Sequence, residues 1–164
     1  MEHERVILGI DPGLATVGYG FLRCSDGQME ILDMGVIETP SGMEEAERLL
    51  MIQYDLSELI LRYRPQESFV EELFFSANVK TALSVSQARG VILVTLASHG
   101  LSPRSLKPNE IKLAVTGDGR ADKLQVQEMI KRQFRLTEIP RPDDAADALA
   151  VAWCGGLASL RGFE

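Results

Sequence analysis

The first quarter of the chain alternates short apolar runs with turn residues, and this pattern predicts strands. Residues 5–10 form a continuous apolar run that ends at Asp11, directly before a Pro-Gly turn, so a buried strand is expected to stop there. Apolar runs at 17–22 and 30–37 follow, and the Ser-Asp-Gly sequence at 25–27 is typical of a β-hairpin turn. We predict three strands that form an antiparallel meander.

Beyond residue 40 the apolar positions recur mainly at helical spacing. Helices are predicted from a Ser41 cap to Pro65, at 76–98, 108–115 and 122–134, and from 143 or 144 to about 160, with strands at 68–73 and 101–106. The order βββαβαβααα predicts an α/β fold whose mixed five-stranded sheet has three antiparallel strands, then parallel additions, and helices on both faces. The length and 45% apolar content suit one core, so we expect residues 1–164 to form a single domain.

The apolar runs and the placement of the cysteines indicate the cellular compartment of the protein. The longest apolar runs, 91–97 and 148–154, fall short of the roughly 20 residues that span a bilayer, and the start of the chain after Met1 is polar. Cys24 and Cys154 lie in apolar contexts without metal-ligand spacing, which indicates reduced core thiols. We therefore expect a soluble cytoplasmic protein that does not bind a membrane.

Charge is distributed unevenly along the chain. The net charge of −7 argues against a generic nucleic-acid-binding protein. However, residues 26–72 carry 12 acids and 3 bases, whereas residues 104–135 carry 8 bases and 4 acids. A local basic stripe beside an acidic metal site suits an enzyme that acts on a phosphate backbone, and a solvated mixed-charge helix surface is the plainer alternative.

Four acids occupy positions whose neighbours are predicted to be buried. Asp11 and Glu71 end apolar runs, and Asp144 and Asp147 open the last apolar helix. Ionised carboxylates are seldom buried unless they are paired or bind a metal. Asp144 and Asp147 share one helix face, and the two alanines between them allow that helix to approach a sheet closely.

These acids converge if Asp11 and Glu71 end neighbouring central strands, because α/β folds place their sites at that edge. Two like charges about 4 Å apart repel by roughly 4 kcal/mol at an effective dielectric near 20, so the cluster needs cations. Two Mg²⁺ ions balance four carboxylates, and oxygen-only ligands favour Mg²⁺, with Mn²⁺ as a substitute, over Zn²⁺. Singly, Asp144 also fits the role of a helix cap, Asp11 that of a turn residue and Glu71 that of an edge-strand residue. Asp147, which lies beyond capping reach, favours the joint site.

Five segments in order resemble the signatures of the RuvC family of bacterial Holliday-junction resolvases, in the ribonuclease H-like superfamily, and together they cover nearly the whole chain. They are ILGIDPG at 7–13, VGYG at 17–20, VEELF at 70–74, QARG at 87–90 and DAADALA at 144–150. The resemblance implies a homodimeric endonuclease that nicks two opposing strands of a four-way DNA junction and leaves 5′-phosphate and 3′-hydroxyl ends. It also implies a role in DNA recombination and repair, with a RuvA–RuvB branch-migration motor as partner.

The resemblance also implies roles for individual residues. Its catalytic and metal-binding acids are Asp11, Glu71, Asp144 and Asp147, and Glu71 is preferred to Glu72 because the family's acid stands three residues before an aromatic. Phe74 resembles a residue that stacks on bases at the junction centre, with a core position as the alternative. Lys112 and Lys123 match basic positions near the active site, and Arg89 and Arg120 are further DNA-binding candidates. Asp143 and Asp118 depart from the family pattern.

On this basis we hypothesise hydrolysis with two metal ions, one lowering the pKa of the attacking water and the other stabilising the leaving 3′ oxygen. The helix at 76–98 is the expected dimer surface. Three alternatives stay open at this stage: an actin-like or sugar-kinase ATPase, for which 164 residues are few; an inactive nucleic-acid-binding module; and an RNA-processing relative.

Overall fold

The five predicted strands form one mixed sheet. The computed structural model describes residues 4–73 and 78–160, so the prediction for Phe74 lies outside the described residues. The strands are β1 (Arg5–Asp11), β2 (Thr16–Ser25), β3 (Gln28–Glu38), β4 (Glu67–Glu71) and β5 (Arg104–Leu106), in the order β3-β2-β1-β4-β5. The first three are antiparallel, and β4 and β5 add in parallel, as predicted. Asp26 and Gly27, with φ of 51° and 74°, form the hairpin turn between β2 and β3.

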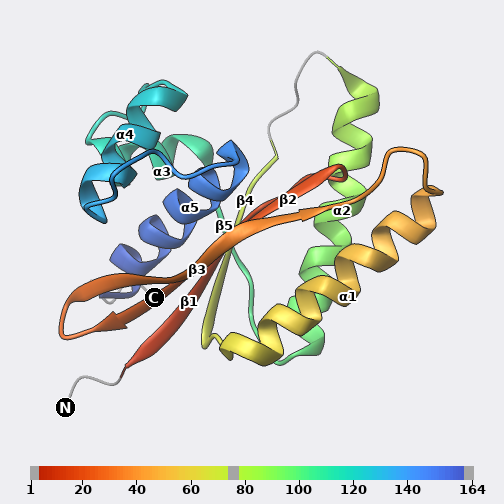
Figure 1. Cartoon of the computed structure of the whole chain (residues 1–164), viewed down its shortest axis with the longest axis horizontal. Helices are drawn as coiled ribbons and strands as arrows, with labels where there is room; N and C mark the ends of the chain where they lie inside the picture. The colour runs from red at the N-terminus through yellow and green to blue at the C-terminus, as the bar shows by residue number, and fades with distance from the viewer. Residues whose placement is uncertain (1–3, 74–77, 161–164) are drawn as a thin grey trace.

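Helices cover both faces of this sheet (Figure 1). One layer consists of α1 (Glu45–Tyr63) and α2 (Val79–Ser98), and the other of α3 (Pro108–Thr116), α4 (Lys123–Gln133) and α5 (Asp143–Leu160). The prediction that Ser41 caps α1 is wrong, because the helix begins four residues later and Glu44 is its N-cap position. The Pro40 carbonyl accepts a hydrogen bond from the Met43 N–H, so a turn takes up Ser41 before the helix starts.

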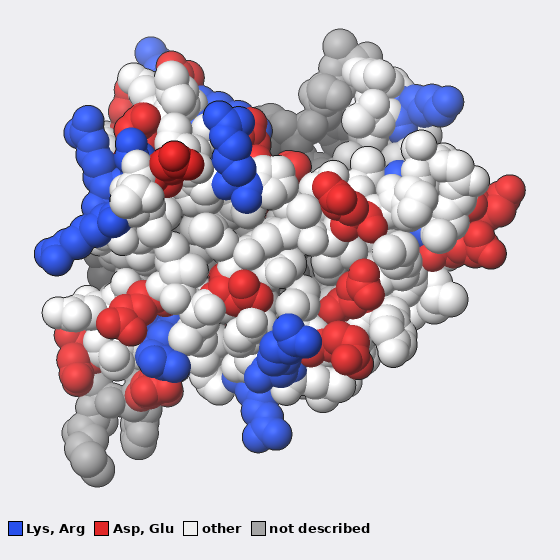
Figure 2. Space-filling model, in the orientation of Figure 1, with Lys and Arg blue, Asp and Glu red and all other residues white. Residues whose placement is uncertain are grey.

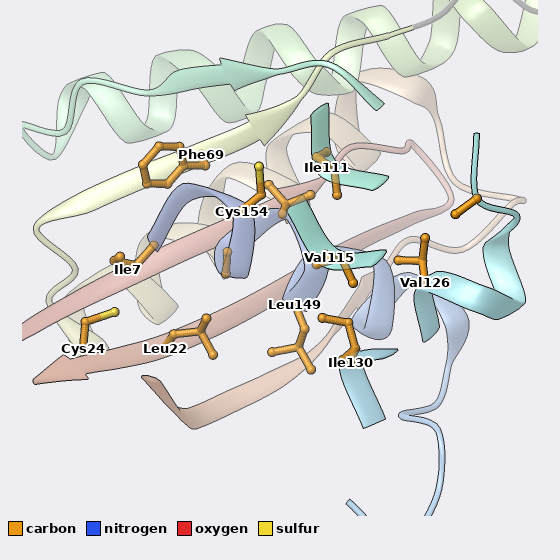
Figure 3. Packing of buried hydrophobic residues seen from close by; sticks show 14 residues of the cluster. Ile7, Leu22, Cys24, Phe69, Ile111, Val115, Val126, Ile130, Leu149 and Cys154 are labelled. Carbon is orange, nitrogen blue, oxygen red and sulfur yellow. The ribbon is translucent and has the colours of Figure 1, made fainter. Parts of the chain in front are cut away.

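The sheet separates two apolar cores. On one face, α3, α4 and α5 pack on residues such as Ile7, Leu22 and Phe69 (Figure 3), and on the other, α1 and α2 pack on Leu8 and Ile10. Cys24 and Cys154 are unpaired and buried, which confirms their interpretation as core thiols. Burial raises the pKa of the Cys154 thiol to about 11, so this group stays protonated at neutral pH.

Glycines in β1 and β2 let α5 lie directly against the sheet. A Cβ on Gly9 would come within 2.5 Å of the Ala148 carbonyl oxygen and 2.7 Å of the Ala152 Cα. A Cβ on Gly18 would meet the backbone of Asp144, with its carbonyl carbon at 2.6 Å. Because the strands have glycine and α5 has small residues at these contacts, the backbones can approach closely. The start of α5 therefore lies at the end of β1.

Helix α2 is the one described helix long and apolar enough to cross a membrane, judged by length and composition alone. The uninterrupted apolar runs considered in the sequence are shorter than this whole helix. Ala88, Ile92 and Leu96 of α2 are nevertheless buried in the core beneath α1 and α2. Packing on this core thus accounts for one side of α2, with Val91 and Leu93 half-buried beside it, whereas Val79, Leu83 and Val94 are exposed.

Candidate active site

The ends of β1 and β4 and the start of α5 bring the four predicted acids to one edge of the sheet. Asp11 is the last residue of β1, and Glu71 is the last of β4. The two strands are parallel neighbours, with Ile10 opposite Val70, so both acids leave the sheet at the same edge. Helix α5 starts at Asp143 and supplies Asp144 and Asp147 from its first turns.

Three of these acids form a compact group. One carboxylate oxygen each of Asp11, Asp144 and Asp147 lies within 4.8 Å of the others, a spacing at which one ion can contact all three. Glu71 is outside this group of three but adjoins it through a side-chain hydrogen bond with Asp11. An oxygen-only set of hard ligands fits Mg²⁺ or Mn²⁺.

Burial and mutual repulsion make this cluster electrostatically unfavourable without a cation. Burial, and then the charges of Glu71, Asp147 and Asp144, raise the pKa of Asp11 to about 9. Burial also raises the pKa of Glu71 and of Asp147, the latter although Lys123 opposes the shift. A carboxylate that keeps its proton near neutral pH because it is buried, and because other carboxylates surround it, is typical of a site built for a divalent cation.

Two lysines share a hollow of about 280 Å³ with the acids. Lys112 of α3 and Lys123 of α4 line it together with Asp11, Glu71 and Asp147. The Lys123 ammonium lies 3.0 Å from an Asp147 oxygen and 3.8 Å from an Asp143 oxygen. The structure therefore places both predicted lysines beside the cluster, where Lys123 is the counterion of Asp147.

The other residues singled out in the sequence, Arg89, Arg120 and Asp143, do not line the hollow that holds the acids. Arg89 donates through Nε to the Glu71 carbonyl oxygen at 3.3 Å and through Nη2 to the Ser105 hydroxyl at 2.7 Å, so it holds the end of β4 in place. Arg120 is exposed in the turn between α3 and α4, where its backbone N–H binds the Asp118 side chain. DNA binding by Arg89 and Arg120 stays a prediction. Asp143 belongs to the site's edge, because it pairs with Lys123.

Sequence reasoning assigned no function to the glycines that seat α5. Gly9 and Gly18 belong to the family-like motifs, and each faces the backbone of α5. The available signal was the occurrence of glycine inside two strands, which often marks a close approach of another backbone.

The raised pKa of Asp11 predicts an unusual pH dependence of stability in the metal-free protein. Asp11 keeps its proton to about pH 9 when folded but titrates near 3.8 when unfolded, so the folded state binds more protons between these values. This contribution to stability is full below pH 3.8 and is lost as pH rises to about 9, with a slope of at most about 1.4 kcal/mol per pH unit.

The measurement is the difference in free energy of unfolding between the wild type and Asp11→Asn, across pH in a chelator. The wild type should lose stability relative to the variant as pH rises, and saturating Mg²⁺ should reduce that loss. A difference that is independent of pH would contradict the assigned environment of Asp11.

A mixed sheet in this order, with acids at the ends of β1 and β4 and on the last helix, defines a ribonuclease H-like protein. The model of the family Crossover junction endodeoxyribonuclease RuvC matches residues 7–155. A RuvC of Chloroflexus aurantiacus is 52% identical over 147 residues, which cover 90% of each protein. The chain belongs to the RuvC family.

Solved structures agree with this assignment. The Thermus thermophilus RuvC in complex with a Holliday junction substrate has a TM-score of 0.90 and 32% identity, and the match covers 96% of each chain. A yeast mitochondrial Holliday junction resolvase, 15% identical, has a TM-score of 0.67 over 96% of this chain and 82% of its own, which shows the shared fold alone. Family membership favours the nuclease over the nucleotide-binding alternative.

Proposed function

We propose that this protein is a structure-selective endonuclease that resolves Holliday junctions in DNA recombination and repair. It makes paired symmetric nicks in two opposing strands and leaves 5′-phosphate and 3′-hydroxyl ends. The observation that carries this proposal is the group of three carboxylates within 4.8 Å of one another at the sheet edge of a RuvC-family chain. The Thermus thermophilus relative, solved with a Holliday junction substrate, supports the same substrate here.

The proposed cofactor is Mg²⁺, two ions per site, with Mn²⁺ as a substitute. Asp11, Asp144 and Asp147 would hold one ion, and Glu71, beside Asp11, would complete the site for the second. The donor set fits, because it consists of carboxylates only, and burial together with their mutual repulsion raises the pKa of Asp11 to about 9. When bound, the two ions supply activation of a water and stabilisation of the leaving 3′ oxygen.

The chain's own residues contribute positioning and charge. Lys112 and Lys123, which line the hollow with the acids, would hold the phosphate and stabilise negative charge that develops on it. Lys123 pairs with Asp147 and would turn to the phosphate once cations neutralise that acid. Arg89 acts as a positioning residue, since it fixes the backbone of Glu71.

The proposal extends to assembly. A homodimer would place two sites against two opposed strands, and the exposed apolar residues Val79, Leu83 and Val94 of α2 are the surface we assign to its contact. We further propose that residues 1–164 act as one domain, that the protein works in the cytoplasm, and that a RuvA–RuvB motor delivers the junction, as the family resemblance implies.

Cleavage of a labelled synthetic four-way junction tests the function. With Mg²⁺ we expect paired, symmetric nicks whose products a ligase can rejoin, and with a chelator we expect none. Linear duplex DNA and an RNA duplex of the same sequence, at the same salt, serve as control substrates. Random degradation of the linear duplex, or faster cleavage of RNA, would overturn the resolvase proposal.

A further inference from the structure

A second hollow, of about 440 Å³, adjoins the acidic cluster on the side of the other helical layer. The lining residues come from the loop after β1, from the start of α1 and from the first turns of α2. Asp144 lines this hollow, whereas Asp11 and Asp147 line the first one. The acids therefore lie where the two hollows meet, with α3 and α4 on one side and α1 and α2 on the other (Figure 1).

The second hollow also contains cations and hydroxyls. Arg48 and Lys80 line it together with Thr81 and Ser84. Within residues 4–73 and 78–160, neither Arg48 nor Lys80 forms an ion pair with a carboxylate. Asp144 is the carboxylate of this hollow, and metal binding at the cluster would neutralise it. Each hollow therefore contributes a pair of cations beside the acids, Lys112 and Lys123 in the first and Arg48 and Lys80 in the second.

Arg48 is held in place by a chain of hydrogen bonds. Its Nε donates to the hydroxyl of buried Thr39 at 2.8 Å, and that hydroxyl donates to the Leu14 carbonyl oxygen at 2.5 Å. The Thr39 N–H also donates to the Ala15 carbonyl oxygen at 3.0 Å. Because Leu14 and Ala15 belong to the loop that follows Asp11, this arrangement fixes the loop and the guanidinium together.

The guanidinium keeps donors for a ligand. An arginine has five N–H donors, and Arg48 uses two of them on Thr39, the second through a long contact of 3.5 Å from Nη2. The other three have no protein partner among the described residues. A fixed guanidinium with free donors and a lysine beside two hydroxyls match the oxygens of a phosphodiester.

We propose that this hollow binds a backbone phosphate of the cleaved strand next to the scissile one, with Arg48 and Lys80 as its ligands. The strand then runs from the hollow with Lys112 and Lys123, over the acids, into the hollow with Arg48 and Lys80. The inference rests on the proposed function, since it names how the same site holds its DNA.

Lys80→Ala is the primary test, because Lys80 is exposed and its loss should leave the fold intact. Junction affinity is measured against salt with Mg²⁺ in an Asp11→Asn background. We expect Lys80→Ala to weaken binding about five- to tenfold at 0.1 M salt and to reduce the slope of log K against log salt by about 0.7–0.9. Lys80→Arg should restore both values.

Arg62→Ala is the matched control. It removes one positive charge from the last turn of α1, about 21 Å along the helix from Arg48. If Arg62→Ala and Lys80→Ala change affinity and slope equally, the effect is one of net charge and the proposed site is wrong.

Uncharged methylphosphonates locate the contact. Each phosphate within three positions of the scissile one, on both sides, is replaced in turn. At one position on one side, the replacement should weaken wild-type binding clearly more than it weakens binding by Lys80→Ala, which keeps only the Arg48 contact. Additive effects at every position would refute the phosphate contact.

The same scan on a linear duplex separates the two proposals. If the methylphosphonate effect depends on Lys80 on the duplex but the junction is not nicked, the phosphate site is supported and the resolvase function is refuted. If the junction is nicked normally but the methylphosphonate effect does not depend on Lys80, the resolvase function is supported and the phosphate site is refuted.

Discussion

Asp11→Asn is expected to abolish Mg²⁺-dependent nicking of a four-way junction while preserving binding. Asp11 is one of the three acids whose oxygens lie within 4.8 Å of one another, and asparagine keeps its shape but not its charge. Loss of a metal ligand removes several kcal/mol of transition-state stabilisation, and each 1.36 kcal/mol is a factor of ten. The nicking rate should fall at least about a thousandfold.

The same substitution should stabilise the metal-free protein. Burial and three neighbouring carboxylates hold the pKa of Asp11 near 9, so a neutral side chain relieves repulsion at pH 9 and above and removes the energetic cost of retaining a proton at pH 7. Glu58→Gln, on the exposed surface of α1, is the matched control and should change neither nicking nor melting temperature noticeably. Near-normal cleavage by purified, folded Asp11→Asn would refute the assigned role.

Gly18→Ala is expected to damage both stability and cleavage. Its Cβ would meet the Asp144 backbone, with the carbonyl carbon at 2.6 Å and the Asp144 Cβ at 3.2 Å, and no side-chain rotation relieves contact with a backbone. Overpacking of this kind costs about 1–3 kcal/mol, which is a fall of roughly 2–12 °C in melting temperature for a domain of this size. A displacement of Asp144 by about 1 Å should cost about a hundredfold in rate.

Gly42→Ala provides the comparison, because a Cβ at Gly42 meets no atom within 4 Å. Melting curves and single-turnover nicking at saturating protein separate the two effects of Gly18→Ala. If the variant melts like Gly42→Ala and cleaves at the wild-type rate, the close packing of α5 on β2 does not position the acids.

The polarised charge of the chain is visible on the folded surface. Figure 2 shows Asp and Glu along the α1 side and much of the Lys and Arg over the side of α3 and α4. The acidic segment 26–72 supplies β3 and α1, whereas the basic segment 104–135 supplies β5, α3 and α4. We therefore expect DNA to cross the cluster between the α3 and α4 side and the hollow at the start of α1, and the acidic remainder of the α1 surface to face away from it.

The order and type of the elements follow from local properties of the sequence. Apolar runs, helical spacing and turn residues depend on neighbours a few positions away, so the strand ends at Asp11 and Glu71 and the start of α5 are predictable. The cost of burying Asp147 inside an apolar helix is equally local. These features were sufficient to predict an acidic site at the edge of the sheet.

Contacts between distant segments required the tertiary structure. The packing of α5 on Gly9 and Gly18 brings Asp144 and Asp147 to Asp11, and the pairing of β1 with β4 places Glu71 beside Asp11. The same holds for Lys123 on Asp147, and for Arg48, which reaches the loop after Asp11 through Thr39. Sequence determined where the charged groups occur along each element, because periodicity is local. The fold determined which of them meet, because a side chain's direction and neighbours depend on how closely two backbones can approach.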